Sequence, residues 1–515
     1  MPVSPSEPRE VLADHHRPRV LARNVTYTLA GIVAPAAVAV AAMPLLAAGL
    51  GTERLGVLTI AWAVIGYFSL LDLGVARALT NRVAAEWGKP THQSLPGVVA
   101  TAGALLLGIG AFGGMVTAVL SSWITRSVLD VSVALQPEVE SSIRLLALAV
   151  PALAVSAGAR GVLEARQRFG LVNAVRVPLG VMMYAGPLAM LSFTQSVLGC
   201  VGALVAVRLA AAVALMLMCV FELPALLEVR RLSRKAVRDL AATGAWMTLA
   251  NVAGSLFTVL DRLVVGGVAG VAMLAYYSTP QEVVTKLSAI PGSISTVMFP
   301  AFSAHAGNHP SRLGATVSRS LHWTVVLLFP ACAAIAMFAP ELLTLWMGRE
   351  FAAAGAGVAR WICAGVLLNG LALTPFGLLQ ASGRARSVAL VQCIELPIYA
   401  FVLWRATRTY GIQGGAAAWA GRAVVDAVIL FALVRRRPAP ATRMWPLLVA
   451  VTTLGVAAAW AMAIAESALA RASWLGLLFT VFAGTCWRLA DPHDTAWLKA
   501  RALGLRGPRQ VGPPC

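Results

Sequence analysis

Apolar stretches of about 18 to 25 residues recur along this chain from residue 24 to residue 489. A helix of that length crosses the roughly 30 Å hydrocarbon core of a bilayer, because each helical residue adds about 1.5 Å. Of the 515 residues, 59% are hydrophobic and 12% are charged, values that do not describe a soluble globular protein. The sequence therefore predicts an all-α, polytopic membrane protein. About fourteen spans are expected, at 24–48, 55–76, 97–120, 142–159, 171–192, 196–219, 241–266, 272–300, 320–343, 356–379, 388–404, 412–434, 444–465 and 473–489.

The distribution of positive charge orients the predicted spans. If the N-terminus is cytoplasmic, the loops on that side hold about 28 of the 41 Lys and Arg residues. Cytoplasmic loops of membrane proteins carry such an excess, so both termini are predicted to be cytoplasmic. The formal charge of +19 is then explained by membrane orientation, and nucleic acid is not an expected partner.

The most basic loop, "EVRRLSRKAVRDL" at 228–240, separates two groups of six predicted spans. It is interpreted as a cytoplasmic linker that orients the protein and touches anionic lipid headgroups. The predicted organisation is an N-terminal cytoplasmic segment (1–23), an N-lobe (24–220), the linker (221–240), a C-lobe (241–435), two extra spans (436–489) and a cytoplasmic tail (490–515).

A weak internal repeat relates the two lobes. The stretch 50–72 lies over 269–291 in pattern rather than in identity, with Gly51 over Gly270. The offset between the two stretches is 219 residues. Each leads from a glycine into an apolar helix, which is the form that repeats take in transporters.

A second match pairs 160–180 with 376–399, and it places Pro178 over Pro397 at the same offset. Both stretches give an apolar helix end, a short basic turn and a helix with an internal proline. Equal order and equal sidedness predict a parallel repeat, with two six-helix lobes related by an axis along the membrane normal. Such lobes would face each other across a central cavity.

Four stretches carry a resemblance to a known family: "LGTERLGVLTIAWAVIGYFSLLDLGVARALTNRVAAE" at 50–86, "RGVLEARQRFGLVNAVRVPLG" at 160–180, 261–305, and "YGIQGGAAAWAGRAVVDAVIL" at 410–430. Together they resemble the bacterial oligosaccharide flippases, the Wzx-type polysaccharide biosynthesis transporters of the multidrug/oligosaccharidyl-lipid/polysaccharide exporter superfamily. The resemblance implies a flippase that moves polyprenyl-diphosphate-linked oligosaccharide to the outer leaflet of a bacterial plasma membrane by ion-coupled alternating access. It also implies protons or sodium ions and glycan assembly proteins as partners.

Three other functions stay open. A multidrug or cation extruder of the same superfamily would favour an acidic, aromatic cavity, whereas the charges within the predicted spans are mostly arginines. The peptidoglycan-precursor flippase would place a cluster of arginines in the first two spans, and the span at 24–48 carries no charge. A membrane-embedded polysaccharide polymerase or ligase would be expected to have a large outer loop, and the longest predicted outer loop is 121–141.

Ionisable residues within the predicted spans are the candidate functional residues, because each costs roughly 2.5 to 3.5 kcal/mol on insertion scales. The candidates for a substrate cavity are Arg176, Arg208, Arg262, Lys286 and Arg422. The candidates for a coupling carboxylate are Asp261, Glu282, Glu395 and Asp426. Asp72 and Arg77, at the inner end of the second span, are interpreted as gate or anchor residues.

Arg176 and Arg208 have no carboxylate within one helical turn of sequence. Each is therefore expected to face either a partner on another helix or a wet cavity. A guanidinium in a cavity suits a diphosphate, because the two can form paired, charge-assisted hydrogen bonds. Glu395 lies beside the break at Pro397, where a kinked helix would form a cavity or a hinge.

Three pairs of opposite charge lie close together in sequence: Asp261 with Arg262, Glu282 with Lys286, and Arg422 with Asp426. Residues four apart share one face of a helix, as in the second and third pairs. Each of these two is either a self-neutralising pair that lowers the cost of insertion, or a site whose carboxylate binds and releases a proton. For Glu282 and Lys286 the hypothesis is that Lys286 meets the anionic head of the substrate.

Two motif-like features are interpreted as structural. "GIGAFG" at 108–113 fits a dinucleotide-binding pattern, but it lies within an apolar span with no preceding strand. Close helix packing explains it better, and Gly110 and Gly114 have the spacing of a helix contact. The seven cysteines are scattered singly, so no disulfide, metal or cofactor is expected.

Overall fold

A computed structural model of the chain describes most residues between 18 and 489. The described residues are 18–68, 75–76, 79–80, 82–83, 95–166, 168–228, 256–257, 259–305, 310–382, 384–435, 449, 452–455, 457, 462 and 467–489. The regular structure in these residues is helical throughout, which confirms the predicted all-α class.

The chain divides into two compact units, Met1–Thr279 and Pro280–Cys515. The first contains α2 (Pro18–Phe68), α4 (Leu95–Trp123), η2 (Ile124–Val128), α5 (Gln136–Ala165), α6 (Phe169–Met190), α7 (Val197–Glu222), η3 (Pro224–Glu228) and the greater part of α9 (Val271–Val284). The second contains the end of α9, η4 (Thr285–Ser288), α10 (Ala289–His305), α11 (Pro310–Met337), α12 (Ala339–Met347), α13 (Arg349–Ala381), α14 (Ala385–Arg435) and α16 (Ala468–Leu489).

Nine helical segments in the described residues are long and apolar enough to cross a membrane. Two of them contain two predicted spans each, because α2 kinks at Gly51 and α14 turns at Gly411. The chain is thus a multi-pass membrane protein, as predicted. The predicted span at 444–465 is described at only a few positions. The predicted orientation of the protein, with both termini in the cytoplasm, stays a prediction.

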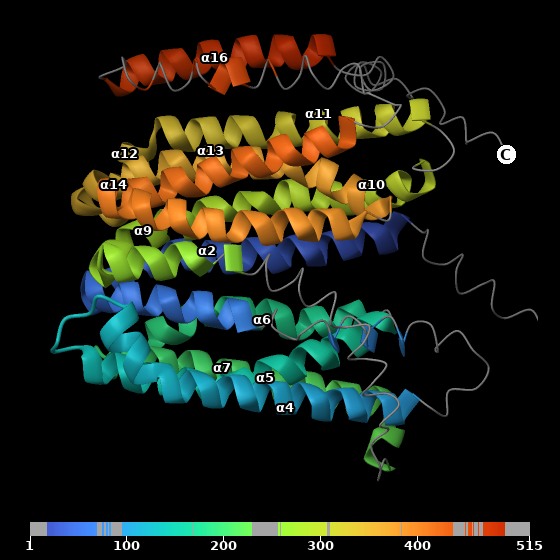
Figure 1. The fold of residues 1–515 in the computed structure, drawn as a ribbon, viewed down its shortest axis with the longest axis vertical. Helices are drawn as coiled ribbons and strands as arrows, with labels where there is room; N and C mark the ends of the chain where they lie inside the picture. The colour runs from blue at the N-terminus through green and yellow to red at the C-terminus, as the bar shows by residue number, and fades with distance from the viewer. Residues whose placement is uncertain are drawn as a thin grey trace, which may run out of the picture. The chain divides into compact units, whose positions relative to one another are not determined.

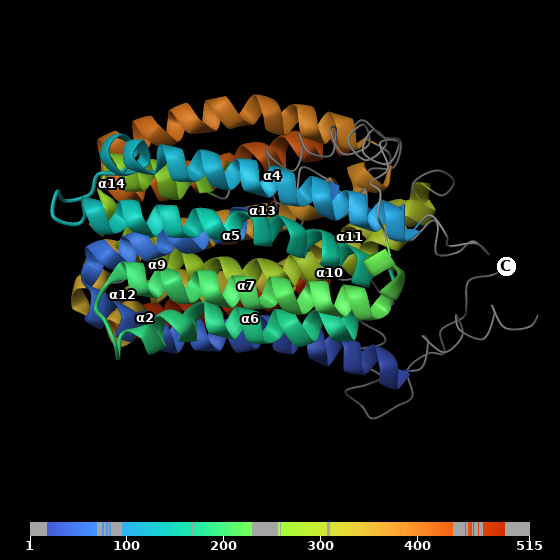
Figure 2. The same ribbon diagram turned by 90° about the horizontal axis from the view of Figure 1, so that it is seen from below.

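Helices α4, α5, α6 and α7 run alongside one another in the first unit (Figures 1 and 2). The glycines of "GIGAFG" and its neighbourhood bring α4 onto α5. A Cβ atom on Gly110 would lie 2.6 Å from the Cα of Pro151, and one on Gly114 would lie 2.6 Å from the carbonyl oxygen of Ala147. The interpretation of this motif as a packing feature is confirmed.

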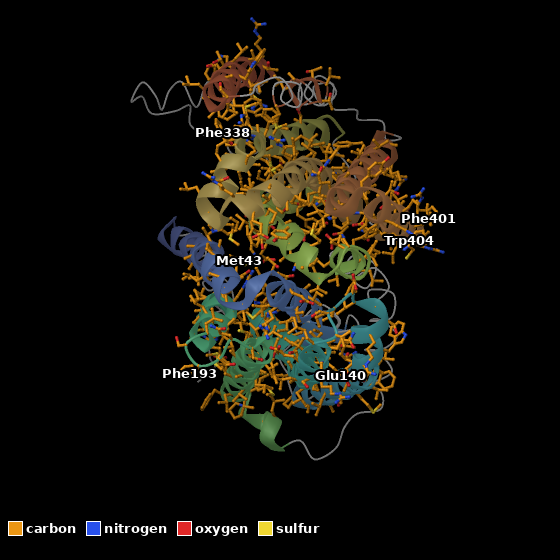
Figure 3. The ribbon with its side chains drawn as sticks, turned by 90° about the vertical axis from the view of Figure 1, so that its left-hand side faces the viewer. Met43, Glu140, Phe193, Phe338, Phe401 and Trp404 are labelled. Carbon is orange, nitrogen blue, oxygen red and sulfur yellow. The ribbon has the colours of Figure 1, made fainter. Side chains whose placement is uncertain are left out.

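Side chains on the outer faces of the helices are large and apolar. Phe401 of α14 is 64% exposed and projects outward in Figure 3, as does Trp404 of the same helix. Phe193, in the turn that follows α6, is 83% exposed and also projects outward. Met43, in contrast, is completely buried. Exposed aromatic and aliphatic side chains of this kind suit helices whose solvent is lipid.

Residues 259–279 belong to the first compact unit, although the sequence assigned them to the second lobe. Two backbone hydrogen bonds, each of 3.2 Å, join Asp130 to this segment: its amide donates to Gly266, and its carbonyl accepts from the amide of Val271. On α2, a Cβ atom at Gly56 would fall 1.9 Å from the carbonyl oxygen of Val271. These contacts explain where the units divide. The linker is described only to Glu228, so the predicted lobe boundaries stay a prediction.

The predicted equivalence of Gly51 and Gly270 is confirmed by their backbone. Gly51 has φ 75° and Gly270 has φ 91°, a left-handed conformation that favours glycine, and each redirects the chain into the following helix.

The two inner turns of the repeat are also alike, but in a different register. The amides of Arg168 and Arg384 each donate a 2.9 Å hydrogen bond to the carbonyl five residues earlier, and in each turn the next helix begins from that arginine's carbonyl. Aligning these turns requires an offset of 216 residues. The alignment of Pro178 with Pro397 is therefore wrong by three residues, since hydrogen bonding rather than the prolines fixes the register.

The core of the second unit lies between α10, α11, α13, α14 and α16. Phe329 of α11 stacks on Phe482 of α16 with ring centroids 4.8 Å apart. Within this apolar core, the hydroxyls of Ser320 and Thr374 lie 3.0 Å apart, which satisfies both of these buried polar groups.

Candidate functional site

Arg176 and Arg208 line a common pocket in the first unit, together with Arg160. The three arginines come from three neighbouring helices, α6, α7 and α5 respectively. The pocket has a volume of about 70 Å³, and Ser156 provides the other polar side chain in a lining that is otherwise apolar. We call this the arginine pocket. The structure brings Arg176 and Arg208 to one pocket, which the sequence did not predict, and it adds Arg160.

The arginine pocket has an excess of positive charge. Within the described residues, the ion pair that Arg160 makes with Glu164, at 3.8 Å, is the only one formed by its three arginines. The buried Nε of Arg208 finds no hydrogen-bond acceptor among those residues. Arg208 is half-buried, whereas Arg160 and Arg176 are exposed. Guanidinium groups that are not fully neutralised attract an anion, and their planar donors match phosphate oxygens.

A second polar group in the first unit surrounds Asp261, which is completely buried. The hydroxyl of Tyr277 donates a 2.9 Å hydrogen bond to its Oδ2, and the amide of Arg262 donates one of 2.8 Å to its Oδ1. The guanidinium of Arg262 lies 3.4 Å from the carbonyl oxygen of Thr59 on α2. Arg262 therefore joins residues 259–279 to α2, while the hydrogen bonds of Asp261 lie within that segment. Arg262 does not line the arginine pocket.

Glu282 and Lys286 form an ion pair in the second unit, with Nζ 2.7 Å from Oε1. The helix changes character at this pair, because α9 ends at Val284 and a 3₁₀ turn, η4, precedes α10. The Lys286 side chain is 39% exposed and that of Glu282 is 14% exposed. A 3₁₀ stretch within a longer helix often marks a hinge. The structure thus brings this predicted pair together at a local change of helix geometry.

Glu395, Arg422 and Asp426 lie together on α14, which turns at Gly411. The guanidinium of Arg422 is 5.8 Å from the ring centroid of Tyr399, so the two halves of α14 run back alongside each other. Both carboxylates are buried, with Glu395 6% exposed and Asp426 8% exposed. Helical spacing predicts that Arg422 lies beside Asp426, whereas the proximity of Glu395 and Tyr399 to them depends on the hairpin.

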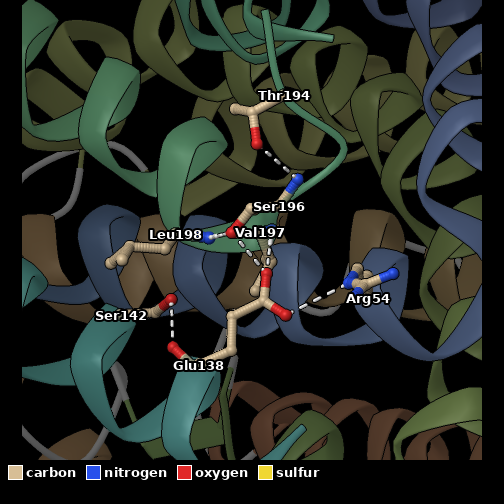
Figure 4. A network of polar contacts seen from close by, with 7 residues as sticks. All are labelled: Arg54, Glu138, Ser142, Thr194, Ser196, Val197 and Leu198. Carbon is tan, nitrogen blue, oxygen red and sulfur yellow. Dashed lines mark hydrogen bonds and ion pairs between the residues drawn. The ribbon is translucent and has the colours of Figure 1, made fainter.

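A network around Glu138 joins three helices of the first unit (Figure 4). Its Oε1 accepts hydrogen bonds of 2.5 Å from the hydroxyl of Ser196 and from the amide of Val197, at the start of α7. Its Oε2 accepts one of 3.2 Å from the Nε of Arg54 on α2. No pattern discussed above predicts this network. Two signals pointed to it, an acidic residue in the first turn of α5 and a serine N-cap before α7.

Asp72 and Arg77 lie outside the described residues, and their predicted gate or anchor role stays a prediction. The remaining candidates fall into four groups. These are the arginine pocket, the Asp261 network, the Glu282 and Lys286 pair, and the α14 cluster of Glu395, Arg422 and Asp426.

Comparison with known proteins gives one family and several structural relatives. A family model described as polysaccharide biosynthesis protein matches residues 45–355. A putative O-antigen transporter of Shigella flexneri is 27% identical over 410 residues, which are 79% of this chain and 96% of that relative. The lipid II flippase MurJ, in an inward closed conformation, gives a TM-score of 0.70 at 11% identity and covers 90% of this chain and 99% of its own. A multidrug resistance MATE family transporter, inward-facing, gives 0.66 at 14% identity, with coverage of 81% and 99%.

Proposed function

Because the chain belongs to the family of polysaccharide biosynthesis proteins, we propose that it is a flippase for lipid-linked oligosaccharide units in a bacterial plasma membrane. The units are built on a polyprenyl diphosphate at the cytoplasmic face and are used outside for surface polysaccharide. The similarity to a putative O-antigen transporter over almost its whole length supports this proposal.

The arginine pocket is the observation that carries the proposal. A diphosphate head is anionic, and moving an isolated ion through hydrocarbon costs tens of kcal/mol by Born solvation. Arg160, Arg176 and Arg208 offer positive charge from three helices in one place. The pocket accommodates a phosphate-sized group rather than a whole oligosaccharide, so it binds the part that all lipid-linked units share.

The arginine pocket also favours an anionic substrate over the organic cations of a multidrug extruder. The likeness to the MATE transporter is one of fold, at 14% identity. The likeness to the lipid II flippase is likewise one of fold, at 11% identity. We assign transport rather than glycan polymerisation, because a relative that matches 79% of this chain is itself a putative transporter.

Transport proceeds by alternating access in this proposal, with an ion gradient as the energy source. The 3₁₀ turn at Lys286 provides a place where the α9 to α10 segment can bend. The ion pair with Glu282 would then break and reform as the substrate passes.

Flipping can be measured directly. The full-length protein is reconstituted in vesicles whose lipid-linked oligosaccharide is initially protected from an added, membrane-impermeant glycosidase. Transport is expected to make the protected oligosaccharide accessible, and vesicles that lack the protein serve as the control. Equal cleavage in both preparations contradicts the proposal. In cells, deletion of the gene should leave the lipid-linked unit at the cytoplasmic face. Normal surface polysaccharide after deletion, in a strain without paralogues, would also contradict the proposal.

A further inference from the structure

Two buried carboxylates lie at the same depth of the α14 hairpin. Glu395 precedes the turn at Gly411 by almost as many residues as Asp426 follows it, and a helix rises about 1.5 Å per residue. Their exposed fractions, 6% and 8%, place both away from solvent and from the lipid-facing surface. Like charges at equal depth on two adjacent helical segments repel each other when both are ionised.

Glu395 lacks donors. Neither of its carboxylate oxygens accepts a hydrogen bond from any described residue. The charged groups that act on it are Arg422 and Asp426, and Arg422 lies one helical turn from Asp426 on the same face. Arg422 therefore serves both carboxylates, while its guanidinium packs over Tyr399.

The helix packed most extensively against α14 is α13. Its charged residues are Arg349, Glu350 and Arg360, all in the half of α13 that lies toward the Gly411 end of the hairpin. A Cβ atom on Gly357, in the same half, would touch the side chain of Gln413 just beyond the turn, which fixes this register. The charge balance around Glu395 is thus set within α14.

With all three side chains ionised, this cluster has one more negative than positive charge. An uncompensated charge buried in a membrane protein is costly, and a carboxylate without donors is the group that bears the cost. One further positive charge removes the imbalance. We propose that Glu395 and Asp426 together bind one proton, with Arg422 neutralising whichever carboxylate stays ionised, and that this proton couples the ion gradient to transport.

A proton fits this site better than a metal ion. Metal cations such as Ca²⁺ require six to eight oxygen ligands, and the site offers two carboxylates beside a guanidinium that repels them. Pro397 lies between Glu395 and Tyr399 inside the first half of α14, and a proline within a helix weakens it locally because it cannot donate a backbone hydrogen bond. A change in the bend there moves Glu395 relative to Arg422, which is how proton binding and helix movement are linked. One proton enters and one leaves in each cycle, and no bond other than O–H forms or breaks.

The proton is tested without transport by infrared difference spectroscopy. The full-length protein in lipid nanodiscs is titrated with acid, and the carbonyl stretch of a protonated carboxyl is followed. We expect this band to be lost near neutral pH in both Glu395→Gln and Asp426→Asn, because Arg422 neutralises the one carboxylate that remains in each variant, and to persist in the control Glu282→Gln. An unchanged band in Glu395→Gln overturns the proposal, and so does loss of the band when sodium is added at constant pH.

The coupling rests on the proposed function and is tested in vesicles with an imposed pH gradient. The gradient should accelerate flipping by the wild-type protein, and Glu395→Gln should lose that acceleration. Equal acceleration in both proteins overturns the coupling role and leaves the flippase assignment intact. If the wild-type protein flips no lipid-linked oligosaccharide while the infrared band behaves as expected, the proposed function fails and the proton site stands.

Discussion

The hydroxyl of Tyr277 donates a 2.9 Å hydrogen bond to the completely buried carboxylate of Asp261. Gly270, with its left-handed backbone, lies between the two residues and turns the chain from one helix into α9. The bond therefore holds two consecutive helices together across their connection. Helix α2 packs on the same segment through Gly56, and this packing holds the segment within the first unit.

Tyr277→Phe is expected to destabilise the protein, because it leaves a buried carboxylate without its hydroxyl donor. A buried group that loses its hydrogen-bond partner costs about 1–3 kcal/mol, and the melting temperature should fall accordingly. Thermal unfolding of the detergent-solubilised protein measures it. The same substitution in an Asp261→Asn background should cost less than in the wild-type protein. Equal losses in the two backgrounds would show that the hydroxyl and the carboxylate do not interact energetically.

Glu138→Gln is expected to loosen the junction of α2, α5 and α7. Glutamine keeps the shape of the side chain but loses the negative charge to which Arg54, Ser196 and Val197 all donate hydrogen bonds. Hydrogen bonds to charged groups contribute about 1.5–3 kcal/mol, so a loss of this order is expected in thermal unfolding. Glu164→Gln, on the same helix and more exposed, is the matched control and should change stability far less. Similar losses in both variants would falsify the assignment of Glu138 as a junction residue.

Much of the fold was predictable because the bilayer imposes it. Apolar length located the helices, and the glycine patterns indicated that α4 makes a close helix contact and that the chain turns at Gly270, although the partner of α4 was not predicted. What failed was detail at helix ends. The predicted fourth span ends at residue 159, whereas α5 continues to Ala165, so Arg160 fell outside the predicted spans and was not among the candidate residues. Its place in a pocket depends on where α6 and α7 lie, which no local pattern encodes.

The α14 cluster also depends on tertiary contacts that local sequence patterns do not encode. Helical spacing alone pairs Arg422 with Asp426. The approach of Glu395 requires the hairpin at Gly411, and hairpins bring together residues of any separation. The Tyr399 ring, which packs against Arg422, was not predicted either, because only residues charged at neutral pH were considered as candidates.

The Glu282 and Lys286 pair gives a prediction about transport rather than stability. The Lys286 side chain is 39% exposed, and its ion pair with Glu282 joins residues four apart on one helix. This ion pair should therefore stabilise the fold by less than about 1 kcal/mol. Glu282→Gln and Lys286→Met are each expected to slow flipping at least tenfold with normal expression. The double variant should be no slower than Lys286→Met alone, since both residues act in one interaction. Transport that survives in all three variants would reduce the pair to a local ion pair.

The arginine pocket makes the sharpest prediction for substrate binding. Arg208→Gln is expected to raise the substrate concentration needed for half-maximal flipping by about tenfold or more, because a charge-assisted hydrogen bond contributes about 1.5–3 kcal/mol and 1.4 kcal/mol is a factor of ten. Arg208→Lys should recover only part of the loss, since an ammonium group lacks the planar fork that matches phosphate oxygens. The matched control is Arg405→Gln, an exposed arginine of α14 that bonds Thr409 of its own helix. Vesicle flipping assays on the three variants decide the matter. If Arg208→Gln and Arg405→Gln raised the half-maximal substrate concentration equally, then net charge, and not this pocket, would govern substrate binding.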